Sequence, residues 1–349
     1  MDNEQQGHKR RVRYRGTHPQ KFGEKYKELA PEKYADTVAK ILQKGNTPAG
    51  MHIPICVNEI LEFLQVQPGQ TGLDATLGYG GHTSELLKRL NGKGHLYALD
   101  IDPIESVKTG ERLARMGYGP EILTIRQMNF ANIDQLTAET GSLDFVLADL
   151  GVSSMQIDNP DRGFSFKKDG PLDLRLNPGT GVSAAQRLRN ITREELEGML
   201  VENADEPYAS EISKTIIRHI RQGGEVSTTT QLRRLIEEAL AFLPAGERKE
   251  AVKKSCQRTF QAMRIDVNSE FEVLGAFLEK LPYVLKSGAR VAILTFHSGE
   301  DRLVKQSFKQ LLHDGVYSEI ATDVIRPSEE ECSRNSRARS AKMRWAIKA

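Results

Sequence analysis

The sequence predicts an α/β protein with a doubly wound, mostly parallel sheet and an inserted helical domain. Three observations support this fold class. Strand and helix patterns alternate between residues 71 and 149, which is typical of parallel strands joined by right-handed crossovers. Helical patterns without intervening strands then continue to about residue 252. The α/β pattern resumes after residue 253.

The alternating region contains four apolar segments that suit buried strands and two amphipathic segments that suit helices. The expected strands are residues 71–76, 95–99, 122–127 and 145–148. The expected helices are residues 83–90 and 104–116, and the first of them places Leu86, Leu87 and Leu90 on one face.

Residues 151–181 are rich in Gly, Pro, Asp and Asn, which predicts an extended loop. Three amphipathic helices are expected after it. They are marked by a capping box at residues 192–195, by Ile212, Ile216 and Ile220, and by Leu232, Leu235, Ile236, Ala239 and Leu240 at helical spacing. We assign residues 160–252 to the insertion, and residues 51–159 and 253–349 to the sheet domain. In this second part we expect a long helix at residues 267–285, a turn at Gly288, a buried strand at residues 291–295 and a last strand at residues 343–347.

Composition excludes several classes of protein. The longest apolar stretch, residues 291–296, is far shorter than the ~20 residues of a membrane span. The first fifty residues are charged and lack the apolar core of a signal peptide. Cys56, Cys256 and Cys332 are too far apart for a CxxC redox motif or a metal knuckle. We therefore expect a cytoplasmic protein that has no bound metal and no membrane partner.

Charge is distributed unevenly along the chain, although the net charge is only +2. Residues 1–50 carry eleven Lys/Arg against six Asp/Glu, and residues 326–349 carry seven against three. Basic ends on an acidic body suit a polyanion partner, and solubilising tails are the alternative interpretation.

Residues 74–82, Asp-Ala-Thr-Leu-Gly-Tyr-Gly-Gly-His, lie between the first expected strand and the first expected helix. Glycines allow the backbone to turn sharply there and to approach a ligand beside a helix N-terminus. Thr83 stands where a GxGxxG dinucleotide fingerprint needs glycine, so the match to a nicotinamide site is incomplete. A turn that serves packing alone is the other interpretation.

Two further acidic residues end strands. Asp100 follows Gly80 by 20 residues, where such sheets use a carboxylate to accept hydrogen bonds from both ribose hydroxyls. Asp102, past the strand end, is a poorer candidate. Asp149 ends the fourth strand, at the edge where doubly wound folds bind ligands. It could cap a helix, anchor a ligand, or accept an N–H from an exocyclic amine that attacks a methyl sulfonium.

Several segments together resemble one family, the bacterial 16S ribosomal RNA cytosine-N4 methyltransferases (MraW/RsmH). The segments occur in the order of that family from about residue 51 to the end. They are residues 52–59, 74–82, 149–154, 162–166, 169–175, 258–264, 267–270, 296–302 and 337–340. The resemblance implies a class I methyltransferase (Rossmann-like) fold and S-adenosyl-L-methionine as the cofactor. It also implies that the insertion recognises the substrate, and that the partner is 16S ribosomal RNA of the small subunit, methylated on a cytidine near the decoding site.

The resemblance also implies roles for individual residues. The cofactor contacts carried over by motif are Gly80, Gly81, His82, Asp100, Phe130, Asp149 and Gln156. Asp100 would bind the ribose, Phe130 would pack near the adenine, and Asp149 is the catalytic candidate. The RNA contacts would be Arg258, Arg264, Arg302, Arg337 and Arg339, because Arg binds phosphate in a bidentate manner and stacks on bases. Any one of these arginines alone could equally form a surface salt bridge.

The chain departs from the family in two places, and other functions stay open. Residues 1–50 have no counterpart in the usual family chain, and Gly299 replaces a larger apolar residue. A paralogue that methylates another RNA cytidine would share every motif, and a non-catalytic ribosome-assembly factor that binds RNA is a further alternative. A cytosine-C5 methyltransferase would need a nucleophilic thiol, for which Cys256 in a basic stretch is the candidate. The oligomeric state is open, with a homodimer as one option.

Overall fold

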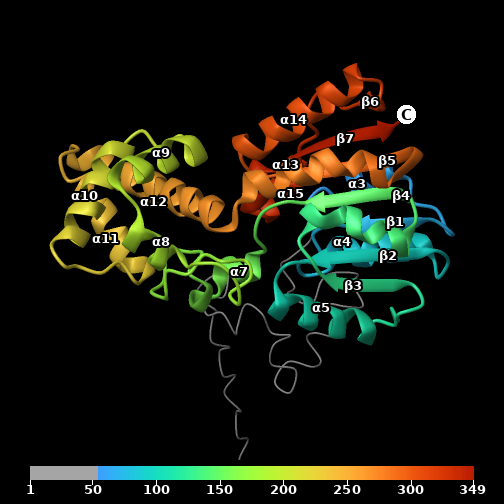
Figure 1. Cartoon of the computed structure of the whole chain (residues 1–349), viewed down its shortest axis with the longest axis horizontal. Coiled ribbons are helices and arrows are strands. Elements are labelled where there is room, and N and C mark those ends of the chain that lie inside the picture. The colour runs from blue at the N-terminus through green and yellow to red at the C-terminus, as the bar shows by residue number, and fades with distance from the viewer. Residues whose placement is uncertain (1–53) are drawn as a thin grey trace, which may run out of the picture. The chain divides into compact units, whose positions relative to one another are not determined.

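A seven-stranded sheet lies at the centre of residues 54–349, the part of the chain that our computed structural model describes. The basic segment of residues 1–50 lies outside the described residues. The strands are β1 (Thr71–Asp74), β2 (His95–Asp100), β3 (Leu123–Gln127), β4 (Leu143–Asp149), β5 (Leu285–Thr295), β6 (Tyr317–Ile320) and β7 (Lys342–Lys348). Their order across the sheet is β3-β2-β1-β4-β5-β7-β6, as Figure 1 shows. All five strands from β3 to β5 are parallel, and β7 is antiparallel to both of its neighbours.

This topology confirms the doubly wound, mostly parallel sheet that the sequence predicts. The chain adds β2 and β3 on one side of β1 and then returns to place β4 on the other side. The strand order therefore reverses at β1, and such a switch point is where doubly wound sheets bind ligands.

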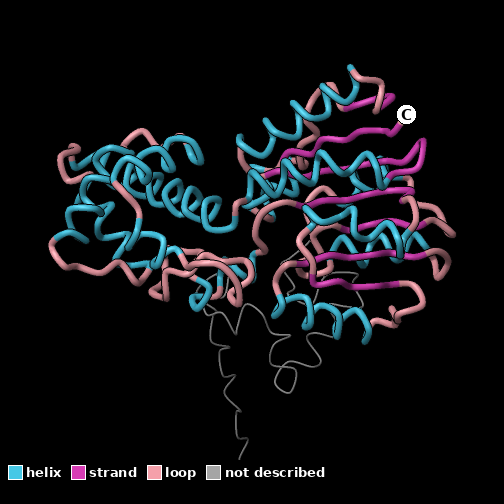
Figure 2. The backbone as a smooth tube through the Cα atoms, in the orientation of Figure 1, coloured by secondary structure: helices cyan, strands magenta, loops and turns pink. Residues whose placement is uncertain are grey.

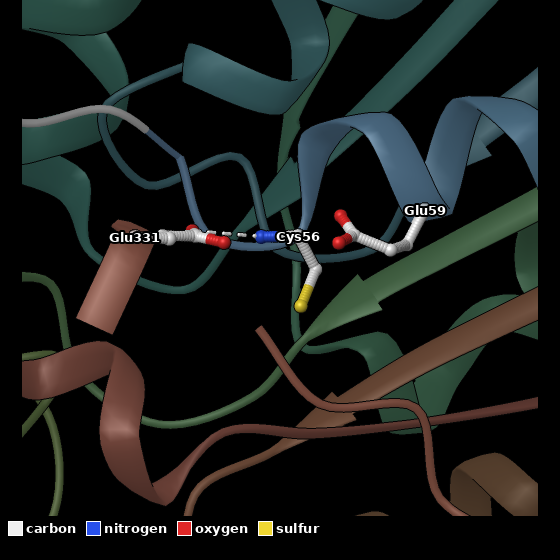
Figure 3. A group of neighbouring side chains, drawn as sticks. All are labelled: Cys56, Glu59 and Glu331. Atoms are coloured by element: carbon white, nitrogen blue, oxygen red, sulfur yellow. Dashed lines mark hydrogen bonds between the residues drawn. The ribbon is translucent and has the colours of Figure 1, made fainter. Parts of the chain in front are cut away.

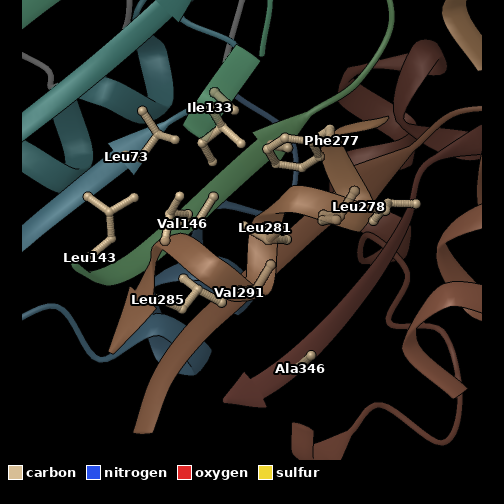
Figure 4. Close-up of a cluster of buried hydrophobic side chains, with 14 of the residues drawn as sticks. Leu73, Ile133, Leu143, Val146, Phe277, Leu278, Leu281, Leu285, Val291 and Ala346 are labelled. Carbon is tan, nitrogen blue, oxygen red and sulfur yellow. The ribbon is translucent and has the colours of Figure 1, made fainter. Parts of the chain in front are cut away.

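Helices cover both faces of the sheet, because successive strand residues point to opposite faces and both sets are apolar. On one face α3 (Val57–Leu64), α4 (Gly81–Leu90) and α5 (Pro103–Arg115) pack against residues such as Leu96 and Phe145. On the other face η2 (Phe130–Leu136), α13 (Glu270–Lys280) and α14 (Ser298–His313) pack against Leu73 and Val146. Figure 4 shows part of this second core, with Ile133 and Phe277 beside the strands.

The helices between β4 and β5 build a core of their own, and they form a separate cluster in Figures 1 and 2. They are α8 (Ala184–Asn190), α9 (Arg193–Ala204), α10 (Ala209–Arg221), α11 (Thr229–Ala239) and α12 (Ala245–Asn268). The three amphipathic patterns of the sequence correspond to α9, α10 and α11, whereas α8 and α12 were not anticipated. The predicted domain boundary at residue 252 falls inside α12, whose buried side chains to Met263 belong to this core.

The single long helix predicted at residues 267–285 is wrong. Helix α12 ends at Asn268, and Ser269 adopts a left-handed conformation with φ 48° before α13 begins at Glu270. The Asn268 amide fixes this break, because it accepts the Leu176 N–H at 2.8 Å and donates to the Leu174 carbonyl at 2.8 Å. Contacts distant in sequence thus override a continuous helical pattern.

Two other expectations need refinement. The loop at residues 151–181 contains the short helices α7 (Ser154–Asp158) and η3 (Pro160–Arg162). The turn at Gly288 lies inside β5, where Leu143 pairs with Leu285 and Phe145 pairs with Arg290. The chain therefore bulges around Gly288, whose φ of 78° suits glycine.

Candidate active site at the carboxyl edge of the sheet

Three aspartates end adjacent parallel strands and therefore meet at one edge of the sheet. Asp100 ends β2, Asp74 ends the central β1, and Asp149 ends β4. The loop between β1 and α4 starts at the same edge. The structure thus brings the candidates Gly80, Asp100 and Asp149 together at the switch point, as the sequence predicts.

Asp74 stabilises the loop between β1 and α4. Its side chain is buried, and it accepts hydrogen bonds from the Thr83 hydroxyl at 2.6 Å and the Thr76 N–H at 3.0 Å. Burial raises the pKa of this carboxyl above its usual range. The Thr76 hydroxyl in turn accepts the Asp149 N–H at 2.6 Å. Asp74 thus connects β1, α4 and the end of β4, a structural role that the sequence motif alone did not reveal.

The glycines of the loop have two different roles. Gly80, with φ 74°, precedes α4, and a Cβ there would lie 2.8 Å from the Thr109 methyl group. A Cβ at Gly81 would lie 2.4 Å from a Pro54 ring carbon, so both positions need glycine for packing. A Cβ at Gly78 would meet only the Thr76 carbonyl oxygen, at 3.8 Å. Within residues 54–349 no side chain caps the N-terminus of α4. A ligand can therefore approach the backbone here and use the positive helix end.

Asp100 presents a partly satisfied carboxylate to this space. One oxygen accepts the Gly78 N–H at 2.9 Å, and the other accepts the Asp102 N–H at 2.8 Å. Burial raises its pKa to about 7, and the nearby Asp102 charge adds to the effect although both N–H groups oppose it. Each oxygen keeps a further lone pair, so the group can accept two hydroxyl hydrogens from a vicinal diol.

Asp149 has one oxygen engaged and one without a partner. Oδ2 lies 3.4 Å from Nδ1 of His82, while the buried Oδ1 has no hydrogen-bond partner among residues 54–349. The Nε2 atom of His82 lies 2.9 Å from the Ile55 carbonyl oxygen. Both ring nitrogens of His82 therefore face protein groups, and its ring offers no free nitrogen to a ligand. The unpartnered Oδ1 of Asp149 is the acceptor that a ligand N–H would complete.

Phe130 and Gln156, the other two predicted cofactor contacts, occupy different settings. Phe130 opens η2 and packs edge-on against Phe277, with ring centroids 5.1 Å apart. Gln156 is buried, and its side-chain carbonyl accepts the Ser153 N–H at 2.9 Å. Its amide nitrogen donates to Asp102 at 2.8 Å. Gln156 thus caps α7 and connects it to the Asp102 carboxylate, with no polar side-chain atom left over.

Asp102 proves to be the anchor of the long loop after β4. Its fully buried side chain caps α5, and Oδ2 accepts Nη1 of Arg162 at 2.6 Å. Nη2 of Arg162 donates to the carbonyls of Arg175 and Leu176 at 3.1 and 2.9 Å. The sequence ranks Asp102 below Asp100 as a ligand and does not predict this structural role. The Asp-Pro pair that opens α5 was the available signal, because Asp at the N-cap followed by Pro marks a helix start.

The five candidate arginines fall into two groups. Arg264 forms a bidentate, largely buried ion pair with Glu270 at 2.8 and 2.9 Å, and Arg337 pairs with Asp158 at 2.9 Å. The side chains of three others form no hydrogen bond or ion pair with another residue within the described range 54–349: Arg258, Arg302 and Arg339. The unpaired arginines are available to a polyanion, whereas Arg264 holds α12 against α13.

Cys56 lies beside this edge, at the start of α3, in a group with Glu59 and Glu331 that Figure 3 shows. The Cys56 N–H donates to Glu331 at 3.0 Å, so this carboxylate attaches the C-terminal segment to α3. Burial, with the two nearby carboxylates, raises the pKa of the Cys56 thiol far above its usual range. The thiol therefore stays protonated at neutral pH.

Comparisons with known proteins complete the description. A model of the MraW methylase family matches residues 49–349. Ribosomal RNA small subunit methyltransferase H 1 of Lachnoclostridium phytofermentans is 70% identical over 348 residues, which cover 100% of this chain and 95% of that protein. Ribosomal RNA small subunit methyltransferase H 2 of Alkaliphilus metalliredigens is 68% identical over 349 residues and covers 100% of both chains.

More distant relatives align without part of the chain. Ribosomal RNA small subunit methyltransferase H of Acidobacterium capsulatum is 38% identical over 85% of this chain and 98% of its own length. Among solved structures, a SAM-dependent methyltransferase from Aquifex aeolicus matches with a TM-score of 0.37 and 11% identity, over 89% of this chain and 98% of that one. No helix within residues 54–349 has the length and apolar character to cross a membrane.

Proposed function

This chain belongs to the MraW methylase family and has the class I methyltransferase fold, and from that membership we propose that it methylates RNA of the small ribosomal subunit. The methyl donor is S-adenosyl-L-methionine. The finer proposal is transfer to the exocyclic N4 of a cytidine in 16S ribosomal RNA near the decoding site. One observation supports an amine as the target: the buried Oδ1 of Asp149, at the carboxyl end of β4, has no hydrogen-bond partner within residues 54–349. The cytidine and its position near the decoding site rest on the family resemblance.

The residues at this edge fit the cofactor. Asp100 would hold the ribose hydroxyls, because its two oxygens each keep a lone pair beside the Gly78 backbone. The uncapped N-terminus of α4, which includes Gly81 and the backbone of His82, would receive a carboxylate. Phe130 supplies an apolar wall for a flat base. Gln156 would order α7, and the second hydrogen of its amide group would be available to the cofactor.

The reaction needs alignment more than a strong base. When bound, S-adenosyl-L-methionine supplies a methyl group on a sulfonium, from which the carbon–sulfur bond breaks as the nitrogen–carbon bond forms. Oδ1 of Asp149 would accept one N–H of the target amine and aim the nitrogen lone pair at the methyl carbon. The same oxygen would take the proton that the nitrogen loses after transfer.

The alternative chemistry at cytosine C5 is disfavoured by the setting of Cys256. This residue lies on α12 inside the helical core and is fully buried. Burial raises the pKa of its thiol to about 12, so it would be neither ionised nor accessible to a base. Cys256→Ser should therefore retain activity, and a folded but inactive variant would overturn the N4 assignment.

We propose residues 160–252 as the RNA-recognition part, with Arg258, Arg302 and Arg339 as phosphate contacts. Charge complementarity supports this, because their guanidinium groups have no partner in the described part of the chain. A ribosomal substrate implies a cytoplasmic location. A homodimer stays a prediction, which light scattering of the purified chain would test.

Mass spectrometry of nucleosides from small-subunit ribosomal RNA tests the proposal. A strain that lacks the gene should lose one methylated cytidine, and the purified chain with S-adenosyl-L-methionine should restore it on subunits from that strain. The product should be N4-methylated. Asp149→Asn should lower single-turnover methylation strongly, because it removes the charge at Oδ1 but keeps the size. No loss of methylation in the strain, or a C5-methylated product, would contradict the proposal.

A further inference from the structure

The imidazole ring of His82 lies between two oxygen acceptors. Nε2 is 2.9 Å from the Ile55 carbonyl oxygen, and Nδ1 is 3.4 Å from Oδ2 of Asp149. The His82 side chain is only 8% exposed, whereas that of Asp149 is 28% exposed, so the ring itself is largely shielded from water. A carbonyl oxygen cannot donate a hydrogen, and therefore Nε2 must carry one.

The proton on Nε2 limits the possible protonation states of Nδ1, which faces Asp149. A neutral imidazole with its proton on Nε2 would direct the Nδ1 lone pair at the lone pairs of the Asp149 carboxylate. That arrangement is repulsive, so the 3.4 Å approach of Nδ1 to Oδ2 favours a second proton on this side of the ring. The charges around the ring favour the location of this proton on the imidazole. Asp149 from β4, Asp74 from β1 and Glu331 from α15 (Glu329–Arg334) are all acidic.

We propose that His82 is a positioning residue, a buried imidazolium that holds Oδ2 of Asp149 and thereby directs the free Oδ1 at the target amine. This inference rests on the proposed function and reassigns His82 from cofactor contact to support of the catalytic carboxylate. Burial alone would lower the pKa of His82, but the hydrogen bond and charge of Asp149 raise it above its usual range. The ring also connects the catalytic edge to Ile55, just before α3.

The imidazolium also acts on the other acidic groups of the catalytic edge. Burial raises the pKa of the nearby Asp74, the charge of Asp149 adds to this shift, and His82 opposes it. A protonated His82 therefore reduces the electrostatic repulsion between the acidic groups at this edge. Loss of the His82 proton at high pH would turn the contact with Oδ2 repulsive, and turnover should therefore fall on the alkaline side.

Two isosteric variants separate the two contacts of the ring. His82→Asn places an amide nitrogen near the position of Nδ1 and can still donate to Asp149. His82→Gln places its nitrogen near the position of Nε2 and can donate only to Ile55. If the role of His82 is to hold Asp149, the rate of single-turnover methylation at saturating cofactor should fall about tenfold in His82→Asn but about a hundredfold in His82→Gln. This is the range expected for loss of a hydrogen bond to a charged group. The fall of turnover at high pH should be absent in His82→Asn.

A readout without RNA keeps this inference separate from the proposed function. Nitrogen-detected NMR of the eight histidines, assigned by comparison with His82→Asn, reports the protonation of the His82 ring. We expect a doubly protonated ring at pH 7.5 in the wild type and a singly protonated ring in Asp149→Asn, even if no RNA is methylated. A neutral ring in the wild type, or a Gln variant that is folded by thermal melting and at least as active as Asn, would overturn the inference.

Discussion

Lowering the pH from 8 to 6 should weaken the binding of S-adenosyl-L-methionine about tenfold, because the Asp100 carboxylate has a pKa of about 7. A ribose diol donates hydrogens and therefore needs the ionised form. With that pKa, about nine-tenths of the groups are ionised at pH 8 and about one-tenth at pH 6. The affinity for the cofactor therefore rises as the pH rises through 7, and it levels off above pH 8.

Replacing Asp100 measures how much its contact with the ribose contributes to cofactor affinity. Asp100→Asn must turn its amide nitrogen toward either the Gly78 or the Asp102 N–H, so one of these donors loses its acceptor. The variant also loses a charge-assisted hydrogen bond of about 1.5–3 kcal/mol, which corresponds to an affinity roughly ten- to a hundredfold lower. Its remaining affinity should no longer change between pH 6 and pH 8.

Isothermal titration calorimetry at several pH values tests this reasoning. Glu111→Gln is the matched control, because Glu111 is an exposed acid on α5 with only a surface partner, Arg115. That control should retain both the affinity and the pH dependence of the wild type. Equal wild-type affinity at pH 6 and pH 8, or an unchanged pH dependence in a folded Asp100→Asn protein, would refute the assignment of Asp100 to the ribose.

Three further predictions concern other parts of the chain. Asp102→Asn should lower the free energy of unfolding by about 3–5 kcal/mol in urea titrations, because it leaves the buried Arg162 guanidinium without its counter-charge. A loss below 1 kcal/mol would argue against this anchor. Arg264→Ala should likewise destabilise the fold by removing the partner of Glu270, whereas Arg258→Ala should weaken RNA binding and leave the melting temperature unchanged. Deleting residues 1–44 should reduce RNA affinity and flatten its dependence on salt, because fewer counterions are released, and an identical salt slope would make the segment a spacer.

The sheet and its edge could be predicted from the sequence because their signals are local. Short apolar segments that end in Asp100 and Asp149 specify both the strands and the position of the acids. Parallel pairing then brings these carboxylates to one edge without further information. The family resemblance added the cofactor and the substrate class, which no single motif of the chain could supply.

The partners of individual side chains could not be predicted, because they come from residues far apart in the chain. The engagement of His82 by Ile55 and Asp149, and the burial of Arg162 against Asp102, depend on how loops pack. The break at Ser269 has the same origin, since an amide contact with residues 174–176 ends an otherwise helical pattern. Charge patterns in the sequence likewise could not separate the paired Arg264 from the unpaired Arg258.

The position of β7 has consequences for the synthesis of the chain. β7 separates β5 from β6 in the sheet, yet it follows both of them in the sequence. While the ribosome translates residues 321–341, β5 has no partner on one edge, and the apolar Val291 and Ile293 lie along it. Unpaired apolar edges promote association between nascent chains. The sheet can therefore close only after residue 348 has emerged, and translation that stops before β7 should give aggregating products rather than a partly active protein.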